Sequence, residues 1–188
     1  AYSDKNCLAT RESTIPVFIF HCATGVLPKK IRAQLIPDRH GLWDTQTLLT
    51  SSRIDVAGRL VMSSAGSLYG AQGKVRTDWM QRMRDKLYPP CRGIDWESSW
   101  TGQIGVTSSK ILRVQMPAPG VFAPAGYNGR GIGTGTVMGR HLAQTLVSDN
   151  RDEFPFPIEN TYRESWRKTR AGYYQTGTLA LQIIGNRV

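Results

Sequence analysis

Residues 126–143, which read GYNGRGIGTGTVMGRHLA, constrain the fold of this chain more than any other stretch. Six glycines fall within its first fourteen residues. Behind them Met138, Leu142 and Leu146 recur every four positions, a spacing that predicts one face of an α-helix. A glycine-rich turn that opens a helix lets backbone N–H groups approach a ligand closely, at the positive end of the helix dipole. The stretch therefore predicts a helix N-terminus that contacts an anionic group.

The dinucleotide-binding motif is one explanation of these glycines. That motif, GxGxxG, requires a preceding strand, a following helix and an acidic residue about twenty positions on. The chain offers only the wider spacing GxGxxxG, from Gly133 to Gly139, and the residues before it, PAGYNGRG, make a poor strand. No βαβ rhythm follows, although acidic residues do: Asp149, Asp152 and Glu153. The context argues against an independent nucleotide-binding fold.

Hydrophobic periodicity and turn residues predict mixed α and β structure along the rest of the chain. The expected elements are a buried strand at 14–23, a short helix at 28–36, strands at 43–49, 51–56 and 59–64 with a hairpin turn at 55–58, a helix at 75–88, strands at 94–106 and 111–114, and a long helix after the glycine turn.

The helix predicted at 75–88 is amphipathic. An apolar stripe is expected to face the core, and the arginines and Lys86 are expected on the opposite, solvated side. The stripe consists of Val75, Trp79, Met80, Met83 and Leu87.

Charge and cysteine content restrict the function classes. The formal net charge is +10, but the excess is spread out and no five like charges adjoin, so a solvated basic surface is the simplest reading. A site for phosphates or a carboxylate substrate, and a basic nucleic-acid-binding domain, remain alternatives. Cys7, Cys22 and Cys91 form no CxxC pair, which favours reduced thiols in the cytoplasm and no metal site. No apolar run reaches the length of a membrane span.

Three blocks of sequence carry a resemblance to a known family. They are IPVFIFHCATGVLP at 15–28, WTGQIGVTSSKILRV at 100–114 and APGVFAPAGYNGRGIGTGTVMGRHLA at 118–143. Together they resemble the C-terminal portion of FAD-dependent oxidoreductases of the D-amino-acid/sarcosine oxidase superfamily, nearest the gamma-glutamylputrescine oxidoreductase type. The third block is the most specific, because GYNGRG followed by a helix that carries GR is seldom met otherwise.

The resemblance implies an α+β or α/β fold with a mixed or antiparallel substrate-domain sheet, its helices, and the last helix of an FAD-binding domain. It implies a remnant of the FAD-binding domain at 1–13, a substrate (cap) domain at 14–106, a flavin-contacting loop and helix at 107–149 and a tail at 150–188. In the family an N-terminal Rossmann unit supplies the first part of the FAD site, and this sequence contains no such GxGxxG unit. We therefore expect a missing N-terminal FAD-binding segment or subunit as partner, and no activity of the chain alone.

The resemblance also assigns residues to the FAD site. The backbone around Gly129, Arg130, Gly131, Ile132, Gly133 and Thr134 would face the pyrimidine end of the isoalloxazine, where a helix N-terminus stabilises negative charge. Some relatives attach flavin covalently through a cysteine at the position of Ile104, so FAD is expected to bind noncovalently here. Arg130 is the side chain expected to act electrostatically, the alternative being an ordinary surface arginine.

Four residues are expected on the substrate side. Trp100, Gln103 and Tyr127 would wall a dry pocket for an amine, and Arg53 would pair with a substrate carboxylate. The predicted reaction is the oxidation of a small amine or amino acid by hydride transfer to flavin, with an imine product and O2 as reoxidant. The alternative, from a different class, is a non-catalytic truncated remnant or interaction module. A homo-oligomer is also left open.

Overall fold

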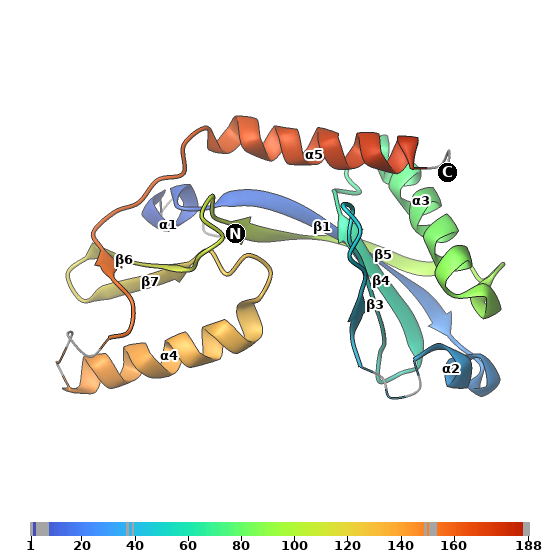
Figure 1. The fold of residues 1–188 in the computed structure, drawn as a ribbon, viewed down its shortest axis with the longest axis horizontal. Coiled ribbons are helices and arrows are strands. Elements are labelled where there is room, and N and C mark those ends of the chain that lie inside the picture. Colours follow the sequence, from blue (N-terminus) through green and yellow to red (C-terminus); the bar gives the residue numbers. More distant parts are fainter. Residues whose placement is uncertain are drawn as a thin grey trace. The chain divides into compact units, whose positions relative to one another are not determined.

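The structure is a computed structural model that describes residues 2, 8–36, 38, 40–148, 150 and 154–185. Cys7 and the acidic residues considered for a dinucleotide site, Asp149, Asp152 and Glu153, lie outside the described residues. The elements (Figure 1) are, in order, α1 (Leu8–Glu12), β1 (Ile15–Val26), α2 (Lys29–Leu35), β2 (Leu42–Trp43), β3 (Thr50–Ile54), β4 (Arg59–Ala65), α3 (Gln72–Leu87), the 3-10 helix η2 (Pro89–Cys91), β5 (Trp96–Val106), β6 (Arg113–Ala118), β7 (Val121–Ala125), α4 (Gly131–Ser148), β8 (Ile158–Glu159) and α5 (Arg167–Ile184).

The chain forms two compact units, each assembled from two separate stretches of sequence. Unit 1 comprises residues 1–17 and 103–172, and unit 2 comprises residues 18–102 and 173–188. The strands β1 and β5 and the helix α5 each contribute residues to both units. The domain boundaries expected from the sequence therefore stay predictions, and the two units are described separately below.

A five-stranded sheet, in the order β2-β3-β4-β1-β5, organises unit 2. The pairs β1–β4, β3–β4 and β2–β3 are antiparallel. Phe20, Cys22 and Met62 are fully buried and pack in one core with Met80 of α3. The intensely apolar run at 14–23 was predicted to be a buried strand, and β1 confirms this prediction.

The β3–β4 hairpin follows its prediction, whereas the strand predicted before it does not. Gly58 closes the hairpin turn with φ +90°, donating its N–H to the carbonyl oxygen of Asp55 at 3.0 Å. The predicted strand at 43–49 is wrong, because only Leu42–Trp43 pairs with β3. The Asp44 carboxylate instead accepts the backbone N–H groups of Gln46 and Thr50, and an Asx-type turn replaces the strand.

The helix α3 departs from the expected division into an apolar stripe and a basic side. Trp79 and Met80 are buried as predicted, but Arg76 and Arg84 are fully buried too. Arg84 pairs with Asp85 at 2.7 Å and lies over the ring of Trp96. The prediction that all arginines of this helix face solvent is wrong, since two of them find partners inside unit 2.

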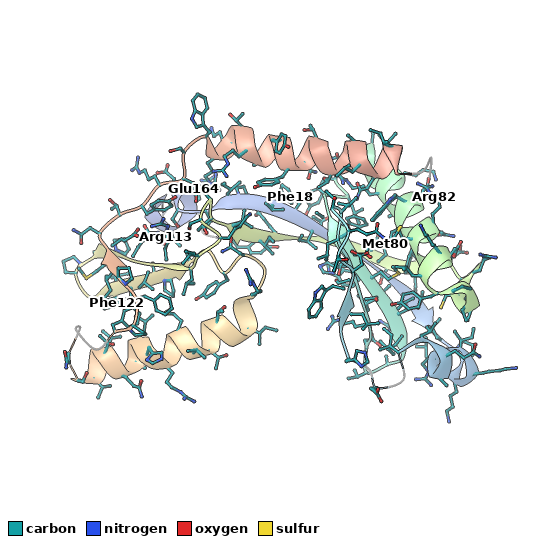
Figure 2. The ribbon with its side chains drawn as sticks, in the orientation of Figure 1. Phe18, Met80, Arg82, Arg113, Phe122 and Glu164 are labelled. Carbon is teal, nitrogen blue, oxygen red and sulfur yellow. The ribbon has the colours of Figure 1, made fainter. Side chains whose placement is uncertain are left out.

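A smaller sheet and the helix α4 build unit 1. The strand β6 pairs antiparallel with β7 and parallel with β8, so this sheet is mixed. Val114, Met138 and Leu142 form a buried cluster, and Phe122 packs against it on the side of β7 that faces α4 (Figure 2). The long helix predicted after the glycine turn is confirmed as α4.

The fold class predicted from the sequence is confirmed at the level of mixed α and β structure with one antiparallel-paired and one mixed sheet. Within the described residues, no helix combines the length and the apolarity that crossing a bilayer requires.

Candidate functional site

The glycine turn joins β7 to α4 through a tight reverse turn. The carbonyl oxygen of Tyr127 accepts the N–H of Arg130 at 2.9 Å, and the two central residues, Asn128 and Gly129, have φ of 53° and 85°. Positive φ at both central positions is the pattern of a type I′ turn, which Asn-Gly pairs favour. The turn delivers the chain directly into the first turn of α4, which begins at Gly131.

The side chain of Asn128 fixes this turn to the end of β5. Its Oδ1 accepts the backbone N–H of Thr107 at 2.8 Å, and its Nδ2 donates to Thr107 Oγ1 at 3.3 Å and to the carbonyl oxygen of Gly126. Thr107 is buried, and its hydroxyl donates to the carbonyl oxygen of Ile111 at 2.9 Å. Because each of these polar groups has a hydrogen-bond partner, hydrogen bonds as well as packing determine the position of the turn.

A cavity of about 390 Å³ lies between the end of β5 and the start of α4, wholly within unit 1. Gln103, Tyr127, Gly129 and Gly131 line it, together with Ile104, Gly105 and the described N-terminal residue Tyr2. The backbone N–H of Gln103 donates to the Tyr2 hydroxyl at 2.6 Å. Burial raises the pKa of Tyr127, so its phenol is protonated at neutral pH. Four of the residues predicted from the sequence thus share one cavity.

Two glycines at the start of α4 have no explanation within the chain itself. Neither Gly131 nor Gly133 has a positive φ. A Cβ on Gly131 would make only ordinary contact with Tyr127 at 3.9 Å, and at Gly133 nothing lies within 4 Å. A glycine inside a helix costs up to about 1 kcal/mol relative to alanine. The open space beside Gly131 and Gly133 would admit a closely approaching ligand, and Gly135 and Gly139 of the same helix are similarly uncrowded.

The other predicted residues of the turn lie at its exposed edge. Arg130 is exposed, and no ion pair involving it occurs within the described part of the chain. Ile132 is 92% exposed. The Thr134 hydroxyl donates to the carbonyl oxygen of Arg130 and so belongs to the first turn of the helix. The backbone N–H groups at the start of α4 and the Arg130 guanidinium both contribute positive potential at this turn.

Trp100 and Arg53 belong to unit 2 and lie outside this cavity. Trp100 is 43% exposed and stacks on His21 with 5.1 Å between ring centroids and 13° between ring planes. Arg53 is exposed on β3. Burial, and next the positive charge of Arg53, lower the pKa of His21.

A buried carboxylate in unit 1, Glu164, was not anticipated from the sequence. Its oxygens accept the backbone N–H of Ser108 at 2.7 Å, the Ser108 hydroxyl, and the Tyr162 hydroxyl at 3.1 Å, and Arg170 lies 3.3 Å away. Burial alone would raise the pKa of Glu164, but these hydrogen bonds and the positive charge outweigh it and lower the pKa. The bonds hold residues that follow β8 against Ser108, the neighbour of Thr107.

Sequence reasoning missed Asn128, Thr107, Glu164 and His21. The Asn-Gly pair at 128–129 is a recognised turn signal and could have identified the first of them. Nothing local marks the others, since their partners lie 21 to 56 residues away or on a neighbouring strand. Among the described residues, no group of three or more His, Cys, Asp or Glu could hold a metal ion.

No protein-family model matches the chain. Its sequence is 26% identical over 170 residues to gamma-glutamylputrescine oxidoreductase of Escherichia coli, covering 81% of this chain and 39% of that protein. It is 23% identical over 139 residues to the Haemophilus influenzae protein named "Probable oxidoreductase OrdL", and this match covers 72% of this chain and 31% of that protein. The chain thus spans well under half the length of these relatives.

The fold has a counterpart among solved structures. Iminodiacetate oxidase from Chelativorans sp. BNC1 matches with a TM-score of 0.60 and 14% identity, covering 84% of this chain and 43% of the oxidase. At that identity the match concerns the fold alone. The resemblance to oxidoreductases inferred from three sequence blocks is therefore supported by two similar sequences and by the fold of a third protein: this chain is similar to part of an oxidoreductase.

Proposed function

We propose that this chain is the flavin-facing and substrate-binding portion of a cytoplasmic FAD-dependent oxidoreductase that oxidises a small amine or amino acid. The observation that carries the proposal is the cavity of about 390 Å³ at the N-terminus of α4, which the predicted residues Gln103, Tyr127, Gly129 and Gly131 line. The similarity to gamma-glutamylputrescine oxidoreductase and the fold of iminodiacetate oxidase add independent support. The buried free thiols of Cys22 and Cys91 accord with a reducing compartment.

The residues at the cavity fit the pyrimidine end of a noncovalently bound flavin. The N–H groups of Gly131, Ile132 and Gly133 in the first turn of α4 have no acceptor within the helix. They would stabilise negative charge at this end of the ring, with the exposed Arg130 adding a full positive charge nearby. Ile104, in place of an attaching cysteine, leaves the cofactor noncovalent.

FAD, when bound, would accept a hydride from the carbon next to the substrate nitrogen, leaving an imine, with O2 as reoxidant. The chain's own contribution is positioning and exclusion of water. Tyr127 and Gln103 line the cavity and would limit solvent at the reacting atoms. Trp100 of unit 2 would wall the substrate, and Arg53 would pair with a substrate carboxylate.

A partner segment is part of the proposal. The helix α4 presents large apolar side chains on the side away from its core cluster: Ile132, Val137, Leu146 and Val147, which are between 55% and 92% exposed. Several large apolar side chains exposed on one helix are a common feature of interaction sites. We assign it to an N-terminal FAD-binding segment or subunit, which would also supply the dinucleotide half of the site; a homo-oligomer is the alternative occupant.

Matched glycine variants test the flavin site in the chain alone. Gly133→Ala and Gly139→Ala each place a methyl group in open space on the same helix, and both should leave the fold intact. Binding of lumiflavin, which is the isoalloxazine without the dinucleotide, is measured by quenching of its fluorescence. We expect Gly133→Ala to weaken binding about tenfold or more and Gly139→Ala to leave it unchanged.

Three outcomes contradict the proposal. Equal binding of lumiflavin by the two variants would mean that Gly133 does not lie against the flavin. No binding of lumiflavin by the unchanged chain would favour a non-catalytic remnant. In a form supplemented with a dinucleotide-binding segment, the visible absorbance of the flavin should bleach on adding an amine. A preparation that stays yellow with every amine and amino acid would rule out the proposed reaction.

A further inference from the structure

The segment that leads into α5 borders a cavity to which the proposed function assigns no role. This cavity has a volume of about 400 Å³, lies wholly within unit 1 and shares no lining residue with the cavity between β5 and α4. Its walls come from Glu12, at the end of α1, and from most of residues 163–169. We call it the α5 cavity. Its volume is in the range of sites that bind small molecules.

The two carboxylates at the α5 cavity already have cationic partners. Glu12 forms an ion pair with Arg163, with 3.0 Å between a carboxylate oxygen and the guanidinium Nε. Glu164, which Figure 2 labels, accepts hydrogen bonds from Ser108 and lies 3.3 Å from Arg170. Each carboxylate is therefore largely neutralised by a partner other than the remaining cations of the cavity.

Those remaining cations are Arg167 and Lys168, and neither takes part in an ion pair within the part of the chain that the structure describes. Arg167 donates from Nε to the carbonyl oxygen of Thr14 at 2.7 Å, and its terminal nitrogens donate to no described residue. Burial, and next the positive charge of Arg11, lower the pKa of Arg167, and Glu12 offsets this only in part. Positive charge thus accumulates at the cavity, where an anion would be attracted.

An exposed tryptophan is the third feature of the α5 cavity. Trp166 lines the cavity with 78% of its surface exposed, and no ring or cation contact to its indole occurs among the described residues. Its carbonyl oxygen accepts the N–H of Arg170 at 2.9 Å, which holds its backbone at the start of α5. A large indole kept in solvent beside positive charge is suited to stack on a flat aromatic ligand.

We propose that the α5 cavity binds a nucleoside monophosphate: the phosphate pairs with Arg167 and Lys168, and the base stacks on Trp166. A phosphate monoester carries about 1.5–2 negative charges at pH 7, so it can neutralise both cations, whereas a carboxylate can neutralise only one. Stacking on an indole tolerates any base, so the site selects for the combination of phosphate and ring. The inference does not depend on flavin, because the α5 cavity is separate from the cavity that carries the proposed function.

Titration of the unmodified chain with inosine monophosphate, a nucleotide that is no part of FAD, tests the inference. NMR follows the indole N–H signal of Trp166, which is identified by its disappearance in Trp166→Asn, and isothermal titration calorimetry gives the affinities. Inosine monophosphate should shift the signal saturably. Inosine, which lacks the phosphate, should bind about tenfold or more weakly, because charge-assisted bonds are lost. Inorganic phosphate, which lacks the base, should bind about fivefold or more weakly.

Three variants locate the site on the chain. Lys168 is exposed, so Lys168→Gln should leave the fold intact and weaken inosine monophosphate binding about fivefold or more. Trp166 has φ of 55°, which asparagine adopts readily, so Trp166→Asn removes the indole without straining the turn. It should weaken inosine monophosphate about fivefold and leave inorganic phosphate unchanged. The matched control Arg140→Gln removes an exposed cation of unit 1 outside the cavity and should bind like the original chain.

Several results would overturn the nucleotide site. One is the absence of saturable inosine monophosphate binding by the original chain. Another is equal weakening by Lys168→Gln and Arg140→Gln, which would indicate attraction to the net positive charge of the chain and not to the cavity. Inosine or inorganic phosphate binding as tightly as inosine monophosphate would likewise contradict the combined recognition of phosphate and base. Far-UV circular dichroism verifies that each variant is folded.

Lumiflavin titration of the same variants separates this inference from the proposed function. Lys168→Gln and Trp166→Asn should bind lumiflavin like the original chain, because neither residue lines the cavity between β5 and α4. If lumiflavin binds in the Gly133-dependent manner and inosine monophosphate does not bind, the inference fails and the proposed function stands. If inosine monophosphate binds and lumiflavin does not, the nucleotide site stands and the proposed function fails.

Discussion

Two of the long helices, α3 and α4, relate amino-acid composition to burial in opposite ways. α3 is rich in charged residues, yet it buries Arg76 and Arg84 completely. α4 carries no acidic residue, yet it exposes Val137, Leu146 and Val147. Composition alone would have placed α3 on the surface and α4 in a core.

The difference lies in what surrounds each helix. Unit 2 provides α3 with acceptors on every side: Arg76 donates to carbonyl and side-chain oxygens of Ala65, Gln175, Thr178 and Gln182. Unit 1 covers one side of α4 with the cluster around Val114, and no described residue covers the other. The buried cations of α3 thus find partners within unit 2, whereas α4 keeps large apolar side chains exposed on its outer side.

The largest effect is expected from removing the buried guanidinium of α3. Arg76→Ala leaves a cavity and several unpaired acceptors, among them Gln182 Oε1, and should lower the free energy of unfolding by about 3 kcal/mol or more. Urea unfolding followed by tryptophan fluorescence measures this. Arg92→Ala, an exposed arginine of the same unit, should stay within about 0.5 kcal/mol. An equal loss of stability in the two variants would mean that the buried contacts of Arg76 do not stabilise unit 2.

An intermediate loss of stability is expected from a substitution at Glu164. It shows whether unit 1 is loosely packed throughout or uncovered only on the outer side of α4. Glu164→Gln should cost about 1–2 kcal/mol at pH 7, because charge-assisted bonds from Ser108 and Arg170 are weakened. The folded pKa of Glu164 lies below its unfolded value. Its contribution is therefore full above the unfolded pKa and is lost as pH falls through the folded pKa.

Unfolding curves measured between pH 7 and pH 3 test this contribution of the Glu164 carboxylate. The range of about four pH units spans the ordinary titration of glutamate. The original chain and Glu164→Gln should converge in stability at the acid end. Glu97→Gln, an exposed glutamate, serves as the control. A difference between the original chain and Glu164→Gln that is constant across pH would contradict the carboxylate cluster.

The smallest effect is expected on the outer side of α4. Leu146→Lys should change the free energy of unfolding of the chain by less than about 0.5 kcal/mol, because Leu146 is 57% exposed. Leu142→Ala, one turn away and facing the core cluster, should cost about 2 kcal/mol or more. If Leu146→Lys destabilises as strongly as Leu142→Ala, the outer side of α4 is covered within this chain and the proposed partner surface is absent.

The sequence predicts the parts of this fold that depend on local signals. The apolar run of β1, the hairpin turn ending at Gly58 and the glycine turn before α4 were each anticipated, since their conformations follow from neighbouring residues. Of the candidate site, Gln103, Tyr127, Gly129 and Gly131 come together at one cavity.

What the sequence did not predict depends on distant partners. Arg76 fits a solvated stripe by periodicity, and its burial depends on acceptors contributed by α5, about 100 residues later in the chain. Likewise, the stacking of His21 on Trp100 follows from strand order, which no local pattern contains. Short-range rules cannot anticipate such pairs.

The discontinuity of unit 2 has a consequence for how the protein is made. On the ribosome, Arg76 emerges well before Gln175, Thr178 and Gln182, the groups that α5 contributes to its guanidinium. At about 5–20 residues per second, the roughly 100 residues between them take about 5–20 seconds to synthesise. Throughout that interval the Arg76 guanidinium lacks the acceptors that α5 contributes. The synthesis of α5 thus sets the earliest moment at which Arg76 can reach all the acceptors that unit 2 provides for it.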